Sequence, residues 1–544
     1  MVAESAAPEL IINNVFYVAM SGRMEAKMKR IIALLLVAVL SIGMVTGCSK
    51  TTKNNSDTTN NGAETTDSGK TDNSKTVNLV LYLYGSEGVA NKDILAALNE
   101  KLKASINTTL EVKYIDWGDI ATKYPLMWSS GEKFDMAYVG AANTVPYATL
   151  VRQGALADIT DLLDKDAPTL KTALANQWDS VKVDGKIYGV PTDYSEYTSY
   201  GFVSRKDLMD KYGISSINSI ADMEKYMDAA VADGQVPLNG KANLSNDLYR
   251  MFIGTTGGWI NAPGISESEL YLAADKADPS KIFAPAFTDE FEAFAVKMHD
   301  WQEKGYWSKD ILSSSQDDKD NFYNGLSAGY ISHQPDWTGS YGTQQQKLPG
   351  VESEFYCFPE ANGKIVRASG VNNATGISAN SKYPDRCLQV IEKLMTDKEC
   401  YDLFQYGIEG RQYELKDGKV TRPAAYDEKK DAGGFASWAF RTDALNIPQL
   451  TEDPRRYTLN DAWSKVAIDN PFVGFSFDSS KVNTELSAIS NVNSQLGIQI
   501  LLGKTSQDPK AAVAEYRKQL KTAGIDDVIK EVNDQWTAYN ASKK

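Results

Sequence analysis

The body of this chain is predicted to be an α/β protein, because three strand-like segments each precede a helical pattern. In order, the predicted pairs are Val77–Tyr84 with a helix that carries Ile94, Leu95, Leu98 and Leu102 on one face, Thr109–Ile115 with Asp119–Trp128, and Phe134–Val139 with Thr144–Gln153. Such alternation is typical of a parallel sheet. Ligands of parallel sheets bind beyond the carboxyl ends of the strands, where this chain places Tyr84, Trp117 and Asn143.

A secretory signal is predicted ahead of this body. Met28–Cys48 begins with two basic residues, continues with an uncharged run too short to span a bilayer, and ends in small residues. Residues 1–27 fit no part of a signal peptide. Met24 and Met28 both offer better starts, and Met28 is the start that we expect, with residues 1–48 forming leader and signal peptide.

The end of the signal, Val45-Thr46-Gly47-Cys48, resembles the lipobox of bacterial lipoproteins. The resemblance implies that Cys48 carries a diacylglycerol thioether and becomes the first residue of the mature protein. Two acyl chains give a stable membrane anchor, whereas one is marginal. Residues 49–75 are almost wholly polar and predict a disordered tether, which as a flexible coil spans roughly 30 Å.

Composition excludes several classes of function. The net charge of −14 argues against a nucleic-acid or anionic-membrane surface. Only two histidines are present, and no Cys/His cluster has ligand spacing, so we expect no metal and no cofactor. Besides Cys48 the chain has Cys357, Cys387 and Cys400; a Cys387–Cys400 bridge is compatible with the sequence, but buried free thiols are the prediction.

Further elements follow the first three strands. Asp184-Gly185 within Val181–Val190 predicts a β-hairpin. Helical patterns are predicted at Arg386–Met395, Tyr401–Tyr406, Ala511–Lys521 and Val528–Trp536.

Two long segments carry a family resemblance. FDMAYVGAANTVPYATLVRQGALADITDLL (134–163) and KIYGVPTDYSEYTSYGFVSRKDLMDKYG (186–213) resemble the extracellular solute-binding proteins of ATP-binding-cassette (ABC) sugar importers. Residues 322–337, Asn372–Ser378 and the GIEGRQY stretch (407–413) are similar to further elements of that family. From about residue 470 the chain resembles a C-terminal module of unassigned function in a lipoprotein subset of the family.

The resemblance implies a type II periplasmic-binding-protein-like fold, in which two α/β lobes are joined by crossing hinge segments and followed by an extra helical segment. The expected division is residues 76–192 for the first part of lobe 1, 193–370 for the main part of lobe 2, 371–469 for the return to lobe 1 and the hinge region, and 470–544 for the C-terminal module.

Aromatic residues are the first candidates for ligand contact, because sugars offer apolar C–H faces that stack on rings. Tyr84 ends the first strand, and four tryptophans lie beside Gly, Asp or Ser in predicted loops: Trp117, Trp259, Trp337 and Trp438. Buried packing is the alternative for each tryptophan. Trp128, Trp178, Trp301 and Trp536 lie in helical patterns and are predicted to pack.

Polar candidates would hydrogen-bond a rim of hydroxyl groups. Asp193, Tyr194 and Glu196 lie on the presumed crossing between lobes, with solvated loop charges as the alternative. The other polar candidates are Asn143, an ordinary turn residue otherwise; His333, a satisfied loop histidine otherwise; Asn373 on the return crossing; and Glu409 and Arg411, which could instead pair with each other.

The sequence therefore leads to the hypothesis of a receptor that is lipid-anchored on the outer face of a bacterial cell membrane and delivers an oligosaccharide to the membrane subunits of an ABC importer by hinge closure. The resemblance to solute receptors implies that the protein is no enzyme, and no GxSxG or HExxH motif stands out. Two alternatives remain open: a surface glycan hydrolase using Asp193 or Glu196, and a receptor for a non-sugar solute such as a peptide.

Overall fold

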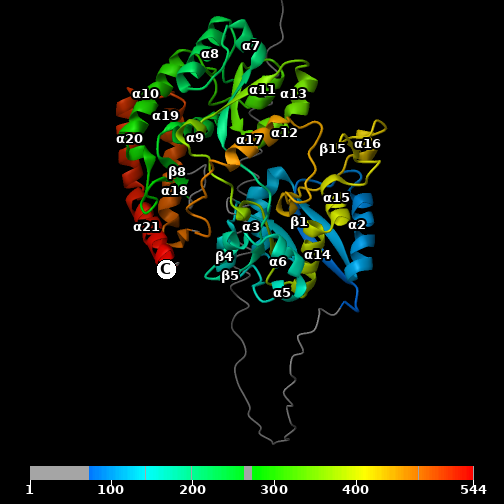
Figure 1. Cartoon of the computed structure of the whole chain (residues 1–544). Helices are drawn as coiled ribbons and strands as arrows, with labels where there is room; N and C mark the ends of the chain where they lie inside the picture. Colours follow the sequence, from blue (N-terminus) through cyan, green and yellow to red (C-terminus); the bar gives the residue numbers. More distant parts are fainter. Residues whose placement is uncertain (1–72, 141–142, 198, 263–271, 476, 543–544) are drawn as a thin grey trace, which may run out of the picture. The chain divides into compact units, whose positions relative to one another are not determined.

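The computed structural model describes residues 73–140, 143–197, 199–262, 272–475 and 477–542 (Figure 1). The predicted signal peptide, Cys48 and residues 49–72 of the predicted tether lie outside the described residues. From Lys70 onward the chain forms one compact unit. Its buried apolar side chains divide into two main hydrophobic cores, each with its own sheet.

The first core surrounds a five-stranded sheet. Its strand order is β2 (Thr108–Ile115), β1 (Val77–Tyr84), β3 (Met136–Val139), β13 (Ala374–Ile377) and β6 (Gly189–Val190). Strand β1 pairs in parallel with β2 and β3, as predicted. Strand β13 runs antiparallel to both β3 and β6, so the parallel prediction holds only for the first three strands. Mixed sheets of this kind are common in large α/β proteins.

The helices of the first core follow the predicted apolar spacing. In α2 (Asn91–Ile106) the side chains of Ile94, Leu98 and Leu102 are fully buried because residues four apart lie on one face. The helix ends at Asn107, which adopts the left-handed conformation. The other helices are α3 (Ile120–Ser129), α4 (Tyr147–Arg152), α5 (Leu163–Asp166), α6 (Pro168–Ala173), α14 (Pro384–Thr396), α15 (Lys398–Tyr406) and α16 (Glu428–Asp431).

Two small hairpins complete this part. The hairpin of β4 (Lys182–Val183) and β5 (Lys186–Ile187) turns at Asp184 and Gly185, whose φ angles are 51° and 78°. Positive φ at both turn residues is what a two-residue type I′ turn requires, and it explains why the Asp-Gly pair predicted the hairpin. The second hairpin joins β14 (Glu414–Lys416) and β15 (Lys419–Thr421).

The second core surrounds two antiparallel three-stranded sheets. One has the order β11 (Gly329–His333), β7 (Tyr200–Arg205) and β12 (Ser353–Cys357), and the other the order β10 (Ile282–Phe283), β9 (Leu272–Asp275) and β8 (Trp259–Ala262). The surrounding helices are α7 (Lys206–Lys211), α8 (Ile220–Ala232), α9 (Leu244–Thr255), α10 (Asp289–Glu303), α11 (Asp318–Tyr323), α12 (Gln334–Gly339), α13 (Tyr341–Lys347) and α17 (Arg455–Ser464).

The C-terminal helices belong to the second core. They are α18 (Asn483–Val492), α19 (Ile498–Leu501), α20 (Pro509–Thr522) and α21 (Ile525–Ser542). Figure 1 shows α20 and α19 beside α10, and their buried side chains share one apolar cluster with α8, α9 and α10. Helix α20 begins where the Asp508 side chain accepts hydrogen bonds from the amides of Lys510 and Ala511, with Pro509 at the first helical position.

Within the part of the chain that the structure describes, three passages connect the two cores. The passages lie between Val190 and Phe202, between Phe358 and Val371, and between Phe440 and Phe472. They are held together by backbone contacts: the Thr192 amide donates to the Gly370 carbonyl at 3.2 Å, and Asp193 forms a parallel bridge with Thr442. We call the parts around the first and second cores the first and second lobes.

The cysteines of the body are Cys357, Cys387 and Cys400, and all three are buried and free, which confirms that prediction. Burial raises the pKa of each thiol, so they stay protonated at neutral pH. Among the helices in the described ranges, none is long and apolar enough to cross a membrane.

Candidate functional site

The carboxyl ends of β1, β2 and β3 bring together the three residues that the sequence places there. Tyr84 is the last residue of β1, Trp117 follows β2, and Asn143 follows β3. The Tyr84 hydroxyl donates to the amide oxygen of Asn143. The Tyr84 and Trp117 rings lie 6.0 Å apart between centroids.

These residues belong to a larger group of rings that we call the aromatic cluster: Tyr84, Trp117, Tyr124, Tyr138 and Trp438. Trp438 reaches it from beyond α15, and its ring lies 5.5 Å from Trp117 and 6.1 Å from Tyr138. Trp117 is 55% exposed although its neighbours are mostly buried. An exposed indole at the edge of such a cluster offers a flat apolar face to a solute.

A chain of polar groups borders the aromatic cluster. The register of β13 against β3 pairs Ala374 with Val139, which places Asn373 beside the end of β3. The backbones approach so closely here that a Cβ on Gly140 would lie 2.5 Å from the Asn372 carbonyl oxygen. The Tyr138 hydroxyl donates to the Asn373 amide oxygen at 2.8 Å.

Glu196 continues this polar chain from the first passage between the lobes. One carboxylate oxygen accepts from the Asn373 amide at 3.5 Å, and the other lies 3.5 Å from the guanidinium of Arg441. Both charged side chains are more than four-fifths buried. The carboxylate and guanidinium neutralise each other, so the aromatic cluster is bordered by a pair with no net charge.

The tyrosine hydroxyls fix the orientation of both asparagine amides. Burial raises the pKa of Tyr84 well above its usual range and that of Tyr138 to about 12, so both hydroxyls are protonated donors. Because they occupy the amide oxygens, the amide nitrogens are available to other groups. The Asn143 amide nitrogen and the Arg441 Nε are both buried without a hydrogen-bond partner among the described residues. Such donors gain most from an acceptor brought by a solute.

Tyr194 connects this polar chain to the second lobe. The Arg441 guanidinium lies 4.1 Å from the centroid of its ring. Arg456 of α17 donates to its hydroxyl and has its guanidinium 5.4 Å from the ring centroid. Each cation–π contact of this kind contributes roughly 0.5–2 kcal/mol to stability.

Asp193 lies at the hinge, and the partners of its carboxyl group are not members of this polar chain. Its carboxyl group interacts with Gln177 and with Asp443. Burial, and then the neighbouring Asp443 charge, raises the pKa of Asp193. Its backbone carbonyl accepts from the Asp443 amide at 3.1 Å.

Two of the predicted tryptophans lie in the second lobe, apart from the aromatic cluster. Trp337 is only 3% exposed, stacks on Phe355 at 5.0 Å, and donates from Nε1 to Ser353 at 2.8 Å. Trp259 packs against Phe252 and Phe283 in the three-stranded sheet of β8. The structure gives both of them packing partners, and ligand contact by either stays a prediction.

The remaining polar candidates also have structural partners. His333 begins α12 by accepting from the Asp336 amide at 3.2 Å, and burial lowers its pKa. Arg411 forms ion pairs with Asp93 at 2.6 Å and Asp431 at 2.8 Å, which link α2 to α16. Glu409 is exposed and forms a backbone bridge with Tyr413. None of these three contacts the aromatic cluster.

Of the thirteen candidate ligand contacts, the structure brings seven into one connected group: Tyr84, Trp117, Asn143, Tyr194, Glu196, Asn373 and Trp438. Sequence reasoning missed Tyr138 and Arg441. Tyr138 lies inside a strand, so the search at strand ends passed over it. Arg441 is 245 residues from Glu196 in the chain, and no local pattern indicates their pairing.

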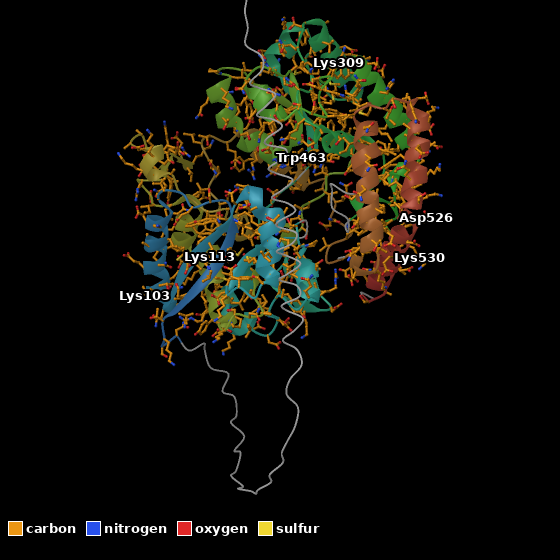
Figure 2. All side chains as sticks on the ribbon, turned by 180° about the vertical axis from the view of Figure 1, so that it is seen from behind. Lys103, Lys113, Lys309, Trp463, Asp526 and Lys530 are labelled. Carbon is orange, nitrogen blue, oxygen red and sulfur yellow. The ribbon has the colours of Figure 1, made fainter. Side chains whose placement is uncertain are left out.

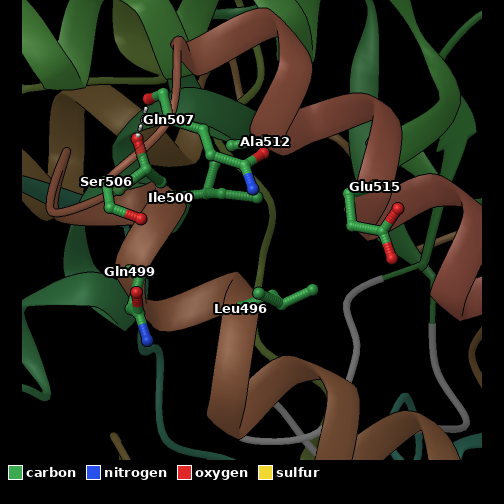
Figure 3. Close-up of a pocket in the computed structure, with 8 residues that line it drawn as sticks. Leu496, Gln499, Ile500, Ser506, Gln507, Ala512 and Glu515 are labelled. Carbon is green, nitrogen blue, oxygen red and sulfur yellow. Dashed lines mark hydrogen bonds between the residues drawn. The ribbon is translucent and has the colours of Figure 1, made fainter.

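A small pocket lies elsewhere, in the C-terminal helices (Figure 3). It is lined by Leu496, Gln499, Ile500, Thr505, Ser506, Gln507, Ala512 and Glu515. Its volume of about 70 Å³ is well below the roughly 300 Å³ at which ligand pockets begin, so it cannot enclose a sugar. Within the described ranges, no group of three or more His, Cys, Asp or Glu side chains could hold a metal ion.

Comparison with protein families gives two matches. The family described as bacterial extracellular solute-binding protein matches residues 94–407, and a domain of unknown function, DUF3502, matches residues 471–541. A carbohydrate ABC transporter substrate-binding protein of Streptococcus pneumoniae is 26% identical over 474 residues, which cover 85% of this chain and 91% of that protein.

Solved structures share the fold. The N-glycan transport solute binding protein of Streptococcus pneumoniae has a TM-score of 0.70 at 22% identity, over 86% of this chain and 100% of that chain. The same protein in complex with Man1GlcNAc has a TM-score of 0.64 at 22% identity, over 85% of this chain and 99% of that one. These likenesses confirm the predicted two-lobed α/β fold.

Proposed function

Because the chain belongs to the family of bacterial extracellular solute-binding proteins, we propose that it is the receptor of an ABC importer and that its solute is a neutral oligosaccharide. The observation that carries the proposal is the half-exposed Trp117 face beside Trp438, bordered by the amides of Asn143 and Asn373 and by Glu196. Rings for C–H faces next to amides and a carboxylate for hydroxyls are the chemistry that sugar recognition needs.

The charge of the site favours a neutral solute. Glu196 and Arg441 pair with each other, so neither presents an uncompensated charge to an acidic or basic ligand. The carbohydrate relative and the Man1GlcNAc complex of the solved relative are consistent with a neutral sugar. An oligosaccharide of mannose and N-acetylglucosamine is therefore the first solute to test.

Binding is proposed to close the lobes over the solute. Three passages of the chain form the hinge, and Tyr194 links the polar chain of the site to Arg456 in the second lobe. A solute that contacts both lobes only in the closed arrangement shifts the population toward it. The closed form is then the one that the membrane subunits of the importer recognise.

The positions of the carboxyl groups favour binding of the solute without hydrolysis. A glycosidase needs two carboxyl groups flanking one bond. Here Glu196 is engaged by Arg441 and Asn373, whereas Asp193 interacts with Gln177 and Asp443 at the hinge. The two carboxyl groups thus serve different neighbours, and we propose that the protein is not an enzyme.

Lipid anchoring at Cys48 is also part of the proposal. The basic pair, the short apolar run and the Val45–Cys48 ending support a lipoprotein signal, and the polar residues 49–75 support a tether. The receptor would then stay on the outer face of the membrane, next to its importer.

Isothermal titration calorimetry of the ectodomain from Lys70 onward tests the solute class. The panel consists of Man1GlcNAc, Man5GlcNAc, other neutral oligosaccharides, an acidic uronate oligosaccharide and short peptides. We expect micromolar or tighter binding to at least one neutral oligosaccharide, with no change in its chain length after overnight incubation. If no neutral sugar gives a binding signal, or if a peptide or a uronate binds tightly, the sugar assignment is wrong.

A further inference from the structure

The segment that leads into the C-terminal helices touches both lobes. We call residues 472–475 and 477–478 the strap. Its rings are part of the second core: Phe472 and Phe475 lie 4.7 Å and 5.1 Å from Trp536 of α21. The strap thus begins where the third passage between the lobes ends.

Helix α21 fixes the strap to the second lobe. Gln535 donates to the Asp478 carbonyl and accepts from its amide, both at 2.8 Å, and the Tyr539 hydroxyl donates to the Val473 carbonyl at 2.8 Å. The helix itself is attached to β10, because Asn533 donates to the Ile282 carbonyl and accepts from the Ile282 amide at 2.8 Å each. The strap therefore moves with the second lobe.

The first lobe contacts the strap from two elements. Arg152, at the end of α4, donates from Nη2 to the Phe477 carbonyl at 3.0 Å. Gly474 lies against the turn after Gln177: a Cβ on Gly474 would be 3.4 Å from the Asp179 carbonyl oxygen. Because a guanidinium hydrogen bond to a carbonyl is charge-assisted, the Arg152 contact is the stronger of the two.

From these contacts we infer a function for the C-terminal module: it is a brace that stabilises the arrangement of the lobes in which the Trp117 ring is exposed to solvent. In the arrangement described here the Arg152–Phe477 bond is formed while Trp117 is 55% exposed. A hinge rotation that covers Trp117 moves α4 relative to a segment fixed to the second lobe, so it strains or breaks this bond. The inference rests on the proposed hinge closure.

Loss of the bond is expected to raise the closed fraction of the ligand-free protein. A hydrogen bond from a charged donor changes the open-to-closed ratio by roughly tenfold to a hundredfold. Since apparent affinity scales with the binding-competent fraction, the dissociation constant for the solute falls by the same factor at most.

A distance measurement without solute tests the brace. Spin labels are attached to the ectodomain from Lys70 at Lys103→Cys in the first lobe and Lys309→Cys in the second; both lysines are exposed and labelled in Figure 2, and the three native thiols are buried. We expect Arg152→Gln to add a second population to the distance distribution, and Arg152→Lys, which keeps a positively charged donor group, to add a smaller one.

Arg517→Gln is the matched control. Arg517 donates to the Ala286 carbonyl at 2.7 Å, so it ties the module to the second lobe without touching the first. The brace is wrong if a folded Arg152→Gln protein has the parental distribution, or if Arg517→Gln shifts it equally. Because no sugar is added, failure of the sugar assignment leaves this result unaffected.

Discussion

Replacing Trp117 with alanine separates a binding role from a packing role. The indole is 55% exposed, and its ring contacts are to Tyr84 at 6.0 Å and Trp438 at 5.5 Å. One edge contact and one tilted contact of a half-exposed ring contribute roughly 1–2 kcal/mol to the folding free energy. The variant therefore stays folded, with a melting temperature a few degrees below that of the parent.

The effect on binding is expected to be larger than the loss of stability suggests. Complete burial of an aromatic side chain yields about 1.5–3 kcal/mol, and about half of this indole is still available for a solute to cover. With a stacking contribution of about 0.5–1.5 kcal/mol, the loss is about 2 kcal/mol, or about 30-fold in Kd. Calorimetry with the best neutral oligosaccharide measures it.

Leu126→Ala provides the matched control. Leu126 lies on α3 of the same lobe and is 61% exposed, and it is not part of the aromatic cluster. Its replacement removes an exposed apolar side chain at no expected cost in affinity. If Trp117→Ala binds the sugar as tightly as the parent, or if Leu126→Ala weakens binding equally, Trp117 is not a platform for the solute.

Three further predictions concern the site, the pH dependence and the anchor. Glu196→Gln leaves the buried Arg441 guanidinium without its charged partner, so it is expected to weaken sugar binding about tenfold and to lower the melting temperature; unchanged calorimetric affinity would count against the polar chain. Burial, and then the Asp317 charge, raises the pKa of Asp318 from an ordinary value of 3.8 to about 6, so the folded state favours the protonated form and stability is lost as the pH rises from about 4 through 6. Asp318→Asn should accordingly raise the unfolding free energy by up to about 3 kcal/mol at pH 7 and by almost nothing at pH 3.5, and equal gains at both pH values in urea denaturation would contradict this cause. Cys48→Ser is expected to move the exported protein from the membrane fraction to the medium, and retention of the variant in membranes would show that another segment anchors it.

Local pattern was sufficient to predict the first three strands of the first lobe and the helices that follow them. Strand β1 has the predicted bounds, Val77–Tyr84, and the buried stripe of α2 follows the predicted spacing. Tyr84, Trp117 and Asn143 were expected to lie together because the carboxyl ends of parallel strands meet at one edge of the sheet, and they do. The predicted starts of β3 and α4 were less accurate. Strand β3 begins at Met136, two residues later than expected, and α4 begins at Tyr147, after Pro146.

Tertiary packing decided what the sequence left open. Trp117 and Trp337 have similar local surroundings, each next to an acidic residue in a predicted loop, yet one is half exposed and the other stacks on Phe355 beneath Arg455. His333 serves as a helix cap because α12 begins directly after β11. The Glu196–Arg441 pair depends on two passages between the lobes that lie far apart in the chain. Local periodicity gives no signal for a contact between residues that lie so far apart in the sequence.

A crystal structure of the ectodomain with its bound oligosaccharide would show the proposed site itself. We expect a sugar ring to lie against Trp117 or Trp438, with hydroxyl groups in hydrogen-bonding distance of Glu196, Asn373 or Asn143. We also expect the second lobe to cover the solute from the other side. A sugar bound anywhere else, such as on the C-terminal helices, with Trp117 still exposed to solvent, would contradict the proposal.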